Sequence, residues 1–241
     1  MMHILVLQHE TVEHPGVFRS FLAEEGHSYD AVELQLGEAL PEDMSGHDAL
    51  WVMGGPMDVW EEDENPWLIS EKAFIRAAVV DAKKPFLGLC LGHQLLACAL
   101  GAEVGPGMPE IGLLTVDVTE NPVDVFAGLP FRLTTLQWHG EEVKTVPDGA
   151  EVLAKSDVCP VQAMRFGPRA ISAQFHLETE PDTVANWAQV PAYAGALERS
   201  LGPGAVKELD ATVAAEMDAL NATARVFYTN WMRLTTDPKT D

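Results

Sequence analysis

The stretch from Phe86 to Gln94, FLGLCLGHQ, constrains the fold of this chain more than any other segment. Its first four residues form an apolar run typical of a buried strand, and Gly88 and Gly92 flank a tight turn into a helix. The first amides of such a helix lack partners and carry partial positive charge, which favours a thiolate at Cys90. Cys90 is therefore a candidate nucleophile. The alternative is a buried structural cysteine, which is the commoner case when no base accompanies the thiol.

A candidate base lies downstream in the run Ala173 to Glu178, AQFHLE. Residues two apart on an extended segment share a face, so Glu178 is placed to orient the imidazole of His176. The other ring nitrogen would then accept the proton of Cys90, which is the logic of a catalytic triad. A lone histidine at a strand end is more often a satisfied polar residue. The glycine-flanked turn and the His-x-Glu pair together favour catalysis.

A third segment, Leu50 to Met57, is another apolar run, and it ends in two glycines and a proline. If this strand lies beside the strand that leads to Cys90, the amides of Gly55 and Leu91 could form an oxyanion hole. Taken alone, a Gly-Gly-Pro sequence after a strand is only a turn signal.

These three segments, in this order and spacing, resemble the class I (triad) glutamine amidotransferases, in particular the free-standing, GMP-synthase-like members. The resemblance covers roughly residues 1 to 190. It implies Cys90 as nucleophile, His176 as base, Glu178 as orienter, Gly55 and Leu91 as oxyanion donors, and substrate contacts from Gly54, Gln94, Trp138, His139 and Glu141, with Glu141 at the ammonium group of glutamine. The family usually has proline after its catalytic histidine. This chain has Leu177, a departure expected to loosen the turn without removing a catalytic atom.

The activity that the resemblance implies is attack on a γ-glutamyl amide through a glutamyl thioester, with release of ammonia or an amine and without a metal or cofactor. The sequence contains no phosphate-binding glycine loop, so an amidotransferase of this kind would depend on a separate synthetase subunit. Two other interpretations stay open. One is a partner-independent γ-glutamyl hydrolase or transferase acting on a peptide or small amide. The other is a glutamine-binding or thiol-sensing protein, which is less favoured because a sensor thiol needs no His-x-Glu pair.

Charge and composition narrow the range of partners. The chain has 15 basic and 37 acidic residues, a net charge of -22 that disfavours binding to nucleic acid or to an anionic membrane. The sequence shows neither a secretory signal nor a membrane span, so we expect a cytoplasmic enzyme with a small-molecule substrate. Cys98 and Cys159 are interpreted as buried thiols. We expect substrate preference to depend on residues outside the shared motifs, such as Met57, Asp58, Trp60, Met108 and Pro109.

The order of strands and helices predicts the fold. Strands are expected at 3–8, 50–53 and 86–89, and helices at 15–26, 66–83 and 91–101, which predicts an α/β fold with a doubly wound, mostly parallel sheet flanked by helices. This agrees with the flavodoxin-like three-layer sandwich that the resemblance implies. Five shorter strands at 111–118, 131–138, 151–154, 161–165 and 170–175 predict a small antiparallel extension. Ligands of such sheets gather at the carboxyl ends of strands, where Gly54, Cys90 and His176 all lie.

The segment from Ala205 to Leu234 has apolar residues at three- and four-residue steps, the pattern of an amphipathic helix. We expect this helix to pack mainly on its own domain, with a homodimer or partner contact as the alternative. The whole chain, residues 1–241, is expected to form a single domain, with a core over 1–190 and a C-terminal helical extension over 191–241.

Overall fold

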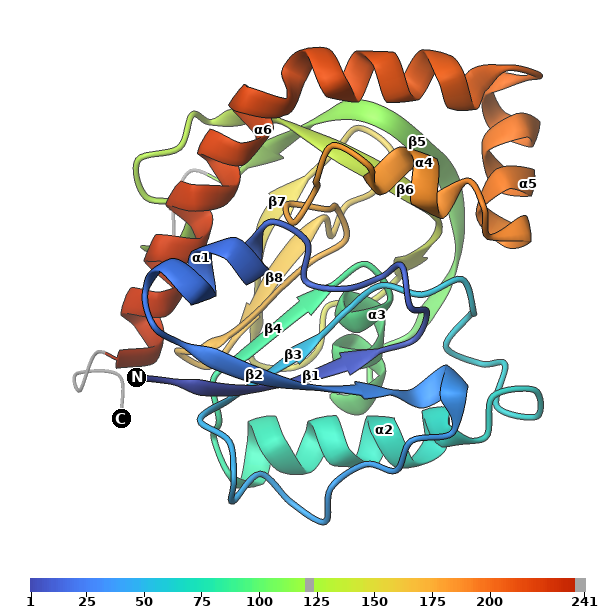
Figure 1. Ribbon diagram of the computed structural model, residues 1–241. Helices are drawn as coiled ribbons and strands as arrows, with labels where there is room; N and C mark the ends of the chain where they lie inside the picture. Colours follow the sequence, from blue (N-terminus) through green and yellow to red (C-terminus); the bar gives the residue numbers. More distant parts are fainter. Residues whose placement is uncertain (120–123, 237–241) are drawn as a thin grey trace.

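A nine-stranded sheet organises the computed structural model, which describes residues 1–119 and 124–236 (Figure 1). The strands lie in the order β2-β1-β3-β4-β9-β8-β7-β5-β6. Their bounds are β1 (His3–Gln8), β2 (Ser28–Glu33), β3 (Ala49–Val52), β4 (Phe86–Leu89), β5 (Val104–Val118), β6 (Arg132–Val143), β7 (Ala150–Lys155), β8 (Ala163–Phe166) and β9 (Ala170–Ala173). The α-helices are α1 (Phe18–Glu24), α2 (Trp67–Arg76), α3 (Leu91–Ala99), α4 (Thr183–Trp187), α5 (Pro191–Leu201) and α6 (Ala205–Thr236), and a π-helical turn, Ala77–Asp81, follows α2.

The sheet has a parallel half and an antiparallel half. Strands β2, β1, β3, β4 and β9 pair in parallel, whereas β8, β7, β5 and β6 pair antiparallel. The expected α/β fold class is confirmed, and its antiparallel part is longer than the sequence pattern suggested. Strand β5 begins well before residue 111. The prolines at 106 and 109 resemble strand breakers in the sequence, but the strand accommodates them at a β-bulge, where the register with β6 shifts.

Strand β2 was not foreseen, for a physical reason. It lies at the edge of the sheet, pairs only with β1, and leaves most of its side chains at least partly exposed. Its sequence, SYDAVE, therefore lacks the apolar alternation that marks a half-buried strand. Charged side chains on an edge strand also discourage pairing with another chain.

Helices cover the parallel strands on both faces, as a three-layer sandwich requires (Figure 1). Successive residues of a strand face opposite sides, so Val6 and Trp51 join the cluster formed with α1 and α6. Leu7 and Val52 join the cluster formed with α2 and α3. The indole of Trp51 meets that of Trp231 on α6 edge to face, with ring centroids 5.5 Å apart.

The long helix α6 buries its apolar stripe against two parts of the same chain. Its later residues, among them Phe227 and Trp231, pack on the sheet beside α1. Its earlier residues, among them Leu209 and Val213, form a third cluster with Trp138 of β6, Trp187 of α4 and Tyr193 of α5. This third cluster fixes α5 against Ile111 of β5 and Trp138 of β6. Within residues 1–119 and 124–236, no helix is long and apolar enough to cross a membrane.

Candidate active site

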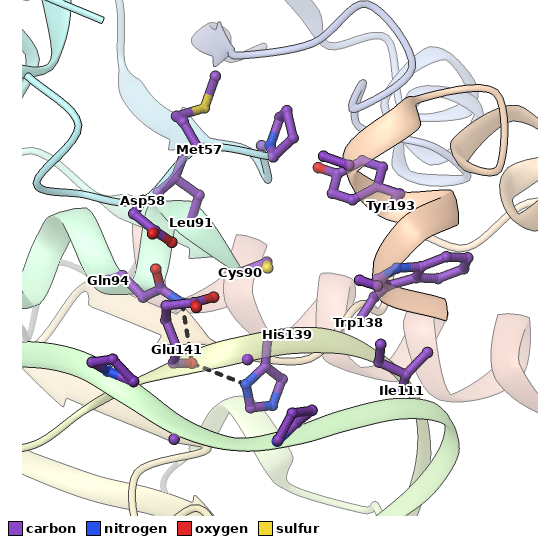
Figure 2. Close-up of a pocket in the computed structure, with 18 of the residues that line it drawn as sticks. Met57, Asp58, Cys90, Leu91, Gln94, Ile111, Trp138, His139, Glu141 and Tyr193 are labelled. Carbon is purple, nitrogen blue, oxygen red and sulfur yellow. Dashed lines mark hydrogen bonds between the residues drawn. The ribbon is translucent and has the colours of Figure 1, made fainter. Parts of the chain in front are cut away.

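Cys90 occupies a strained turn between β4 and α3. Its backbone angles, φ 49° and ψ -105°, belong to a region that L-residues rarely adopt, at a conformational cost of about 1–3 kcal/mol. The Cys90 amide donates to the carbonyl of Ala173 at 2.9 Å, and the amides of His93 and Gln94 donate to the Cys90 carbonyl. The backbone is therefore held on both sides of the turn, and Cys90 borders an open pocket (Figure 2).

A glycine at position 92 allows α3 to begin directly on the end of β3. A Cβ atom at Gly92 would lie 2.0 Å from the carbonyl oxygen of Val52, so no other residue fits without displacing backbone. The glycine loop after β3 also packs closely against the turn, since a Cβ at Gly55 would lie 2.8 Å from the side chain of Leu91. Gly55 and Leu91 border the same pocket as Cys90. In the described part of the chain, neither of their amides donates a hydrogen bond.

His176 comes just after β9 and is brought to Cys90 by the pairing of β9 with β4. Its amide donates to the carbonyl of Leu136 at 2.9 Å, which fixes the backbone. The Nδ1 atom lies 2.7 Å from Oε1 of Glu178, and the imidazole lies close enough to the Cys90 thiol for each group to shift the pKa of the other. All three side chains are nearly fully buried. The three residues expected to form a triad are thus side by side.

Glu178 is fixed through both its side chain and its backbone. Its Oε2 atom accepts a hydrogen bond from the amide of Leu177 at 2.9 Å, and its carbonyl accepts one from Val17 at 2.9 Å. Gly16 packs directly against that carbonyl, and a Cβ there would lie 1.7 Å from the oxygen. The expectation that Leu177 loosens this turn needs revision, because leucine supplies an N–H donor that proline lacks.

Burial and charge act in opposite directions on the two reacting groups. Burial raises the pKa of the Cys90 thiol, while the hydrogen bond and charge of His176 lower it. Burial alone would lower the pKa of His176. The Glu178 carboxylate and the hydrogen bond with Cys90 outweigh it and raise the pKa of His176 well above its ordinary value. Glu178 therefore makes the imidazole more basic, as the removal of a proton from the thiol requires.

A second carboxyl group, from Glu13, lies beside this set and was not foreseen from the sequence. The Oε1 atom of Glu13 accepts a hydrogen bond from the hydroxyl of Tyr193 on α5, while its buried Oε2 has no partner among the described residues. One of its carboxylate oxygens lies within 4.8 Å of a ligand atom of His176 and of one of Glu178. Desolvation raises the pKa of Glu13 to about 7, although the charge of His176 opposes this shift.

The raised pKa of Glu13 predicts how stability depends on pH. A carboxyl group whose folded pKa is about 7 and whose ordinary value is 4.5 keeps its proton longer in the folded state, so stability falls between these pH values. The full penalty is roughly 3 kcal/mol above pH 7. We expect Glu13→Gln to remove this loss, because glutamine can still accept the Tyr193 hydrogen bond and carries no charge.

Urea unfolding of both proteins at pH 5 and pH 8 measures this difference. The matched control is Glu216→Gln, at an exposed position on α6, which should retain the pH dependence of the unchanged protein. A Glu13→Gln protein that loses as much stability as the control on going from pH 5 to pH 8 would contradict the prediction.

Another unforeseen pair, His9 and Glu71, supports the glycine loop from behind. Both side chains are fully buried, and Nε2 of His9 lies 2.8 Å from Oε1 of Glu71. Nδ1 of His9 bonds to the carbonyl of Gly54 at 2.9 Å, which fixes the peptide that precedes Gly55. His9 follows β1 and Glu71 lies on α2, so no local sequence signal links them.

The pocket in front of Cys90 has a volume of about 820 Å³. Of the residues expected to bind substrate or form the oxyanion hole, those that line it are Gly55, Leu91, Gln94, Trp138, His139 and Glu141. Gly54, His176 and Glu178 are not among the residues that line it. Met57, Asp58 and Pro109 also line it, as expected. Trp60 and Met108 do not, and their side chains are exposed on the surface.

Amide side chains connect this pocket to the sulfur atom. Nε2 of Gln94 donates to the carbonyl of Glu141 at 3.3 Å and to Oε1 of Gln174 at 3.1 Å. Nε2 of the fully buried Gln174 lies 3.6 Å from the Cys90 sulfur, within reach of a weak hydrogen bond. The carbonyl of Glu141 also bonds to Nδ1 of His139 at 3.0 Å. Gln94 is thus held in a fixed orientation at the pocket wall (Figure 2).

Two groups of side chains in the described residues have ligand atoms close enough to hold a metal ion. One is Glu13, His176 and Glu178, whose Nδ1 and Oε1 atoms are already engaged in the hydrogen bonds above. The other is His3, Asp30 and His47, at the surface beside β1 and β2. In the group beside Cys90, His176 and Glu178 are thus hydrogen-bonded to each other.

Comparison with known proteins identifies what this chain is similar to. The model of the family glutamine amidotransferase class-I matches residues 20–186. A glutamine-hydrolyzing GMP synthase subunit of Methanocaldococcus jannaschii is 44% identical over 41% of this chain and 53% of its own length. The glutamine amidotransferase-like protein YfeJ of Salmonella typhimurium is 32% identical over 76% of this chain and 78% of its own length.

Solved structures resemble the whole fold. A glutamine amidotransferase of Thermotoga maritima superposes with a TM-score of 0.86 at 28% identity and covers 98% of this chain and 99% of its own. A glutamine amidotransferase of Methylobacillus flagellatus gives a TM-score of 0.83 at 27% identity, over 97% of this chain and 95% of its own. The chain spans about half the length of the first GMP synthase subunits that it matches.

Proposed function

Because the chain belongs to the class I glutamine amidotransferase family, we propose that it cleaves γ-glutamyl amides with Cys90, His176 and Glu178 as its catalytic triad. The observation that carries this proposal is the buried His176–Glu178 hydrogen bond beside the Cys90 thiol, which lines a large pocket. In this proposal, Gly55 and Leu91 supply the oxyanion amides. Gln94 and Glu141 hold the amino-acid end of the substrate, beside Trp138, His139 and Gly54.

The first half of the reaction forms a thioester. The Cys90 proton passes to the free ring nitrogen of His176, and the sulfur attacks the γ-carbonyl carbon of the substrate. The carbonyl electrons move to the oxygen, and the unpaired amides of Gly55 and Leu91 stabilise the resulting oxyanion. When the oxyanion collapses, the carbon–nitrogen bond breaks, and His176 returns its proton to the departing ammonia or amine.

The second half releases glutamate. A water molecule gives a proton to His176 while its oxygen attacks the thioester carbon, and the carbon–sulfur bond breaks. The proton on His176 then returns to the thiolate, which restores the starting state. An amine in place of water would give a transferase by the same steps.

Two kinds of enzyme fit this mechanism. The names of the GMP synthase relatives suggest a glutamine-hydrolysing component, so this chain would pass ammonia to a separate synthetase, and activity would rise when that partner is added. The alternative is a partner-independent γ-glutamyl hydrolase or transferase. The pocket volume of about 820 Å³ favours the alternative, because ligand sites of about 300–1,000 Å³ suit molecules much larger than one amino acid. A binding or sensing protein without turnover fits less well, since it has no need of a basic imidazole beside the thiol.

Trapping of the thioester tests the proposed function. The purified protein is mixed with glutamine or with a series of γ-glutamyl amides, quenched in acid and digested, and the peptides are analysed by mass spectrometry. We expect a glutamyl group on the peptide that contains Cys90, formed together with free ammonia or amine. The proposal fails if no compound yields either an adduct or a product, or if the adduct is confined to Cys98 or Cys159.

A further inference from the structure

One wall of the pocket comes from a helix that the family model does not include. The match ends at residue 186, whereas α5 begins at Pro191. The α5 residues that border the pocket are Ala192, Tyr193, Ala196, Arg199 and Ser200. Their three- and four-residue spacing places them on one face of the helix. Tyr193 and Leu197 are buried in the cluster with α6, so this wall is a fixed part of the site.

The two sides of the pocket differ in chemistry. Figure 2 shows Asp58, Gln94 and Glu141 on one side of Cys90, and Tyr193, Trp138 and Ile111 on the other. Desolvation and the nearby charges of Glu141 and Glu61 raise the pKa of Asp58 to about 6, the behaviour of a carboxyl group in an acidic, partly desolvated environment. This acidic side suits the α-ammonium group of a γ-glutamyl substrate.

Arg199 is the one lysine or arginine among the described lining residues, and it lies on α5, the helix that also carries Tyr193. In the described part of the chain, its guanidinium has no ion pair or side-chain hydrogen bond. The guanidinium presents a planar set of donors that matches a carboxylate in two parallel hydrogen bonds. Arg199 is thus free to bind an anionic group of a ligand in the pocket.

We propose that the site takes a γ-glutamyl conjugate whose amine part carries a carboxylate, a γ-glutamyl amino acid or peptide, and that Arg199 selects it. This inference rests on the proposed function. With the glutamyl ammonium group at Asp58 and Glu141 and the γ-carbonyl at Cys90, the amine part extends to the opposite side, along α5. The pocket volume leaves room for both parts, and ammonia alone would leave the α5 wall without a ligand group to contact.

Two matched substrates separate the carboxylate from the rest of the amine part. γ-Glutamylglycine and γ-glutamylglycinamide differ only in that the second has a neutral amide in place of the carboxylate. We expect the unchanged protein to prefer γ-glutamylglycine by about tenfold or more in kcat/KM, as expected for hydrogen bonds to a charged group. In Arg199→Gln, the ratio of the two kcat/KM values should fall to near one. Arg233→Gln, at an exposed position on α6, is the control and should keep the original ratio.

The outcomes separate this inference from the proposed function. Equal kcat/KM values for the two substrates in the unchanged protein overturn this inference. An Arg199→Gln protein whose kcat/KM falls by the same factor for both substrates also overturns it, since Arg199 would then bind the glutamyl half. Turnover of glutamine but of neither conjugate also overturns this inference and leaves the proposed function intact. A folded protein that turns over none of the three compounds, and shows no adduct on Cys90, overturns both. Circular dichroism confirms that each variant is folded.

Discussion

Cys90→Ala is expected to lower kcat/KM for every γ-glutamyl amide by roughly 10⁴-fold or more, to the limit of detection. The reason is chemical, because alanine offers no electron pair to the γ-carbonyl carbon and no thioester can form. The oxyanion amides and the pocket would remain, so the variant should still bind substrate while releasing neither ammonia nor amine. Ammonia or amine release, measured together with substrate affinity by calorimetry, tests both parts of this prediction.

The two other cysteines provide matched controls for this experiment. Cys98, expected to be buried, is only partly buried; it lies on α3, two helical turns beyond Cys90. Cys159 is fully buried as expected, and desolvation raises its pKa to about 12. Neither lines the pocket. Cys98→Ala and Cys159→Ala should therefore keep most of the activity. Turnover that survives in Cys90→Ala, or that disappears in Cys98→Ala with the fold intact, would refute the assigned nucleophile.

The turn at Cys90 could be predicted from sequence because its cause is local. An apolar strand, two glycines and a helix start lie within nine residues, and the close approach of Gly92 to β3 allows only glycine. The place of His176 followed from the same kind of evidence, since a strand end in a parallel sheet lies at the edge where ligands gather. The structure brings these local signals together through the pairing of β4 with β9.

The remaining parts of the site depend on contacts between distant segments. Glu13 lies in a loop without a motif, and the chain fold alone brings it beside His176 and Glu178 and to the hydroxyl of Tyr193, 180 positions away. A helical extension was expected over 191–241, but the sequence pattern did not indicate that its first helix, α5, supplies the pocket wall that carries Arg199. Strand β6 was expected to stop at residue 138, yet it continues to Val143 and places Glu141 within the sheet. Such features follow from packing, which the sequence pattern of a single segment does not report.

His176→Ala is expected to be nearly as damaging as Cys90→Ala, because it removes the group that takes the thiol proton and returns it to the leaving nitrogen. Glu178→Ala should retain about 10²-fold more activity than His176→Ala, since Glu178 orients and charges the imidazole but transfers no proton itself. Rates of amine release for both variants, measured with the same substrate at neutral pH, give this ratio. Equal losses in the two variants would contradict the division of roles.

The pH dependence of the residual activity provides a second and independent test of His176. Burial raises the pKa of the Cys90 thiol, and the hydrogen bond and charge of His176 lower it. Without the imidazole, the thiolate should therefore form only at higher pH, so the residual rate of His176→Ala should increase steeply toward alkaline pH. Glu178→Ala keeps the imidazole next to the sulfur, and its rate should increase less. If the rate of His176→Ala is independent of pH up to the limit of protein stability, another group takes the proton from Cys90.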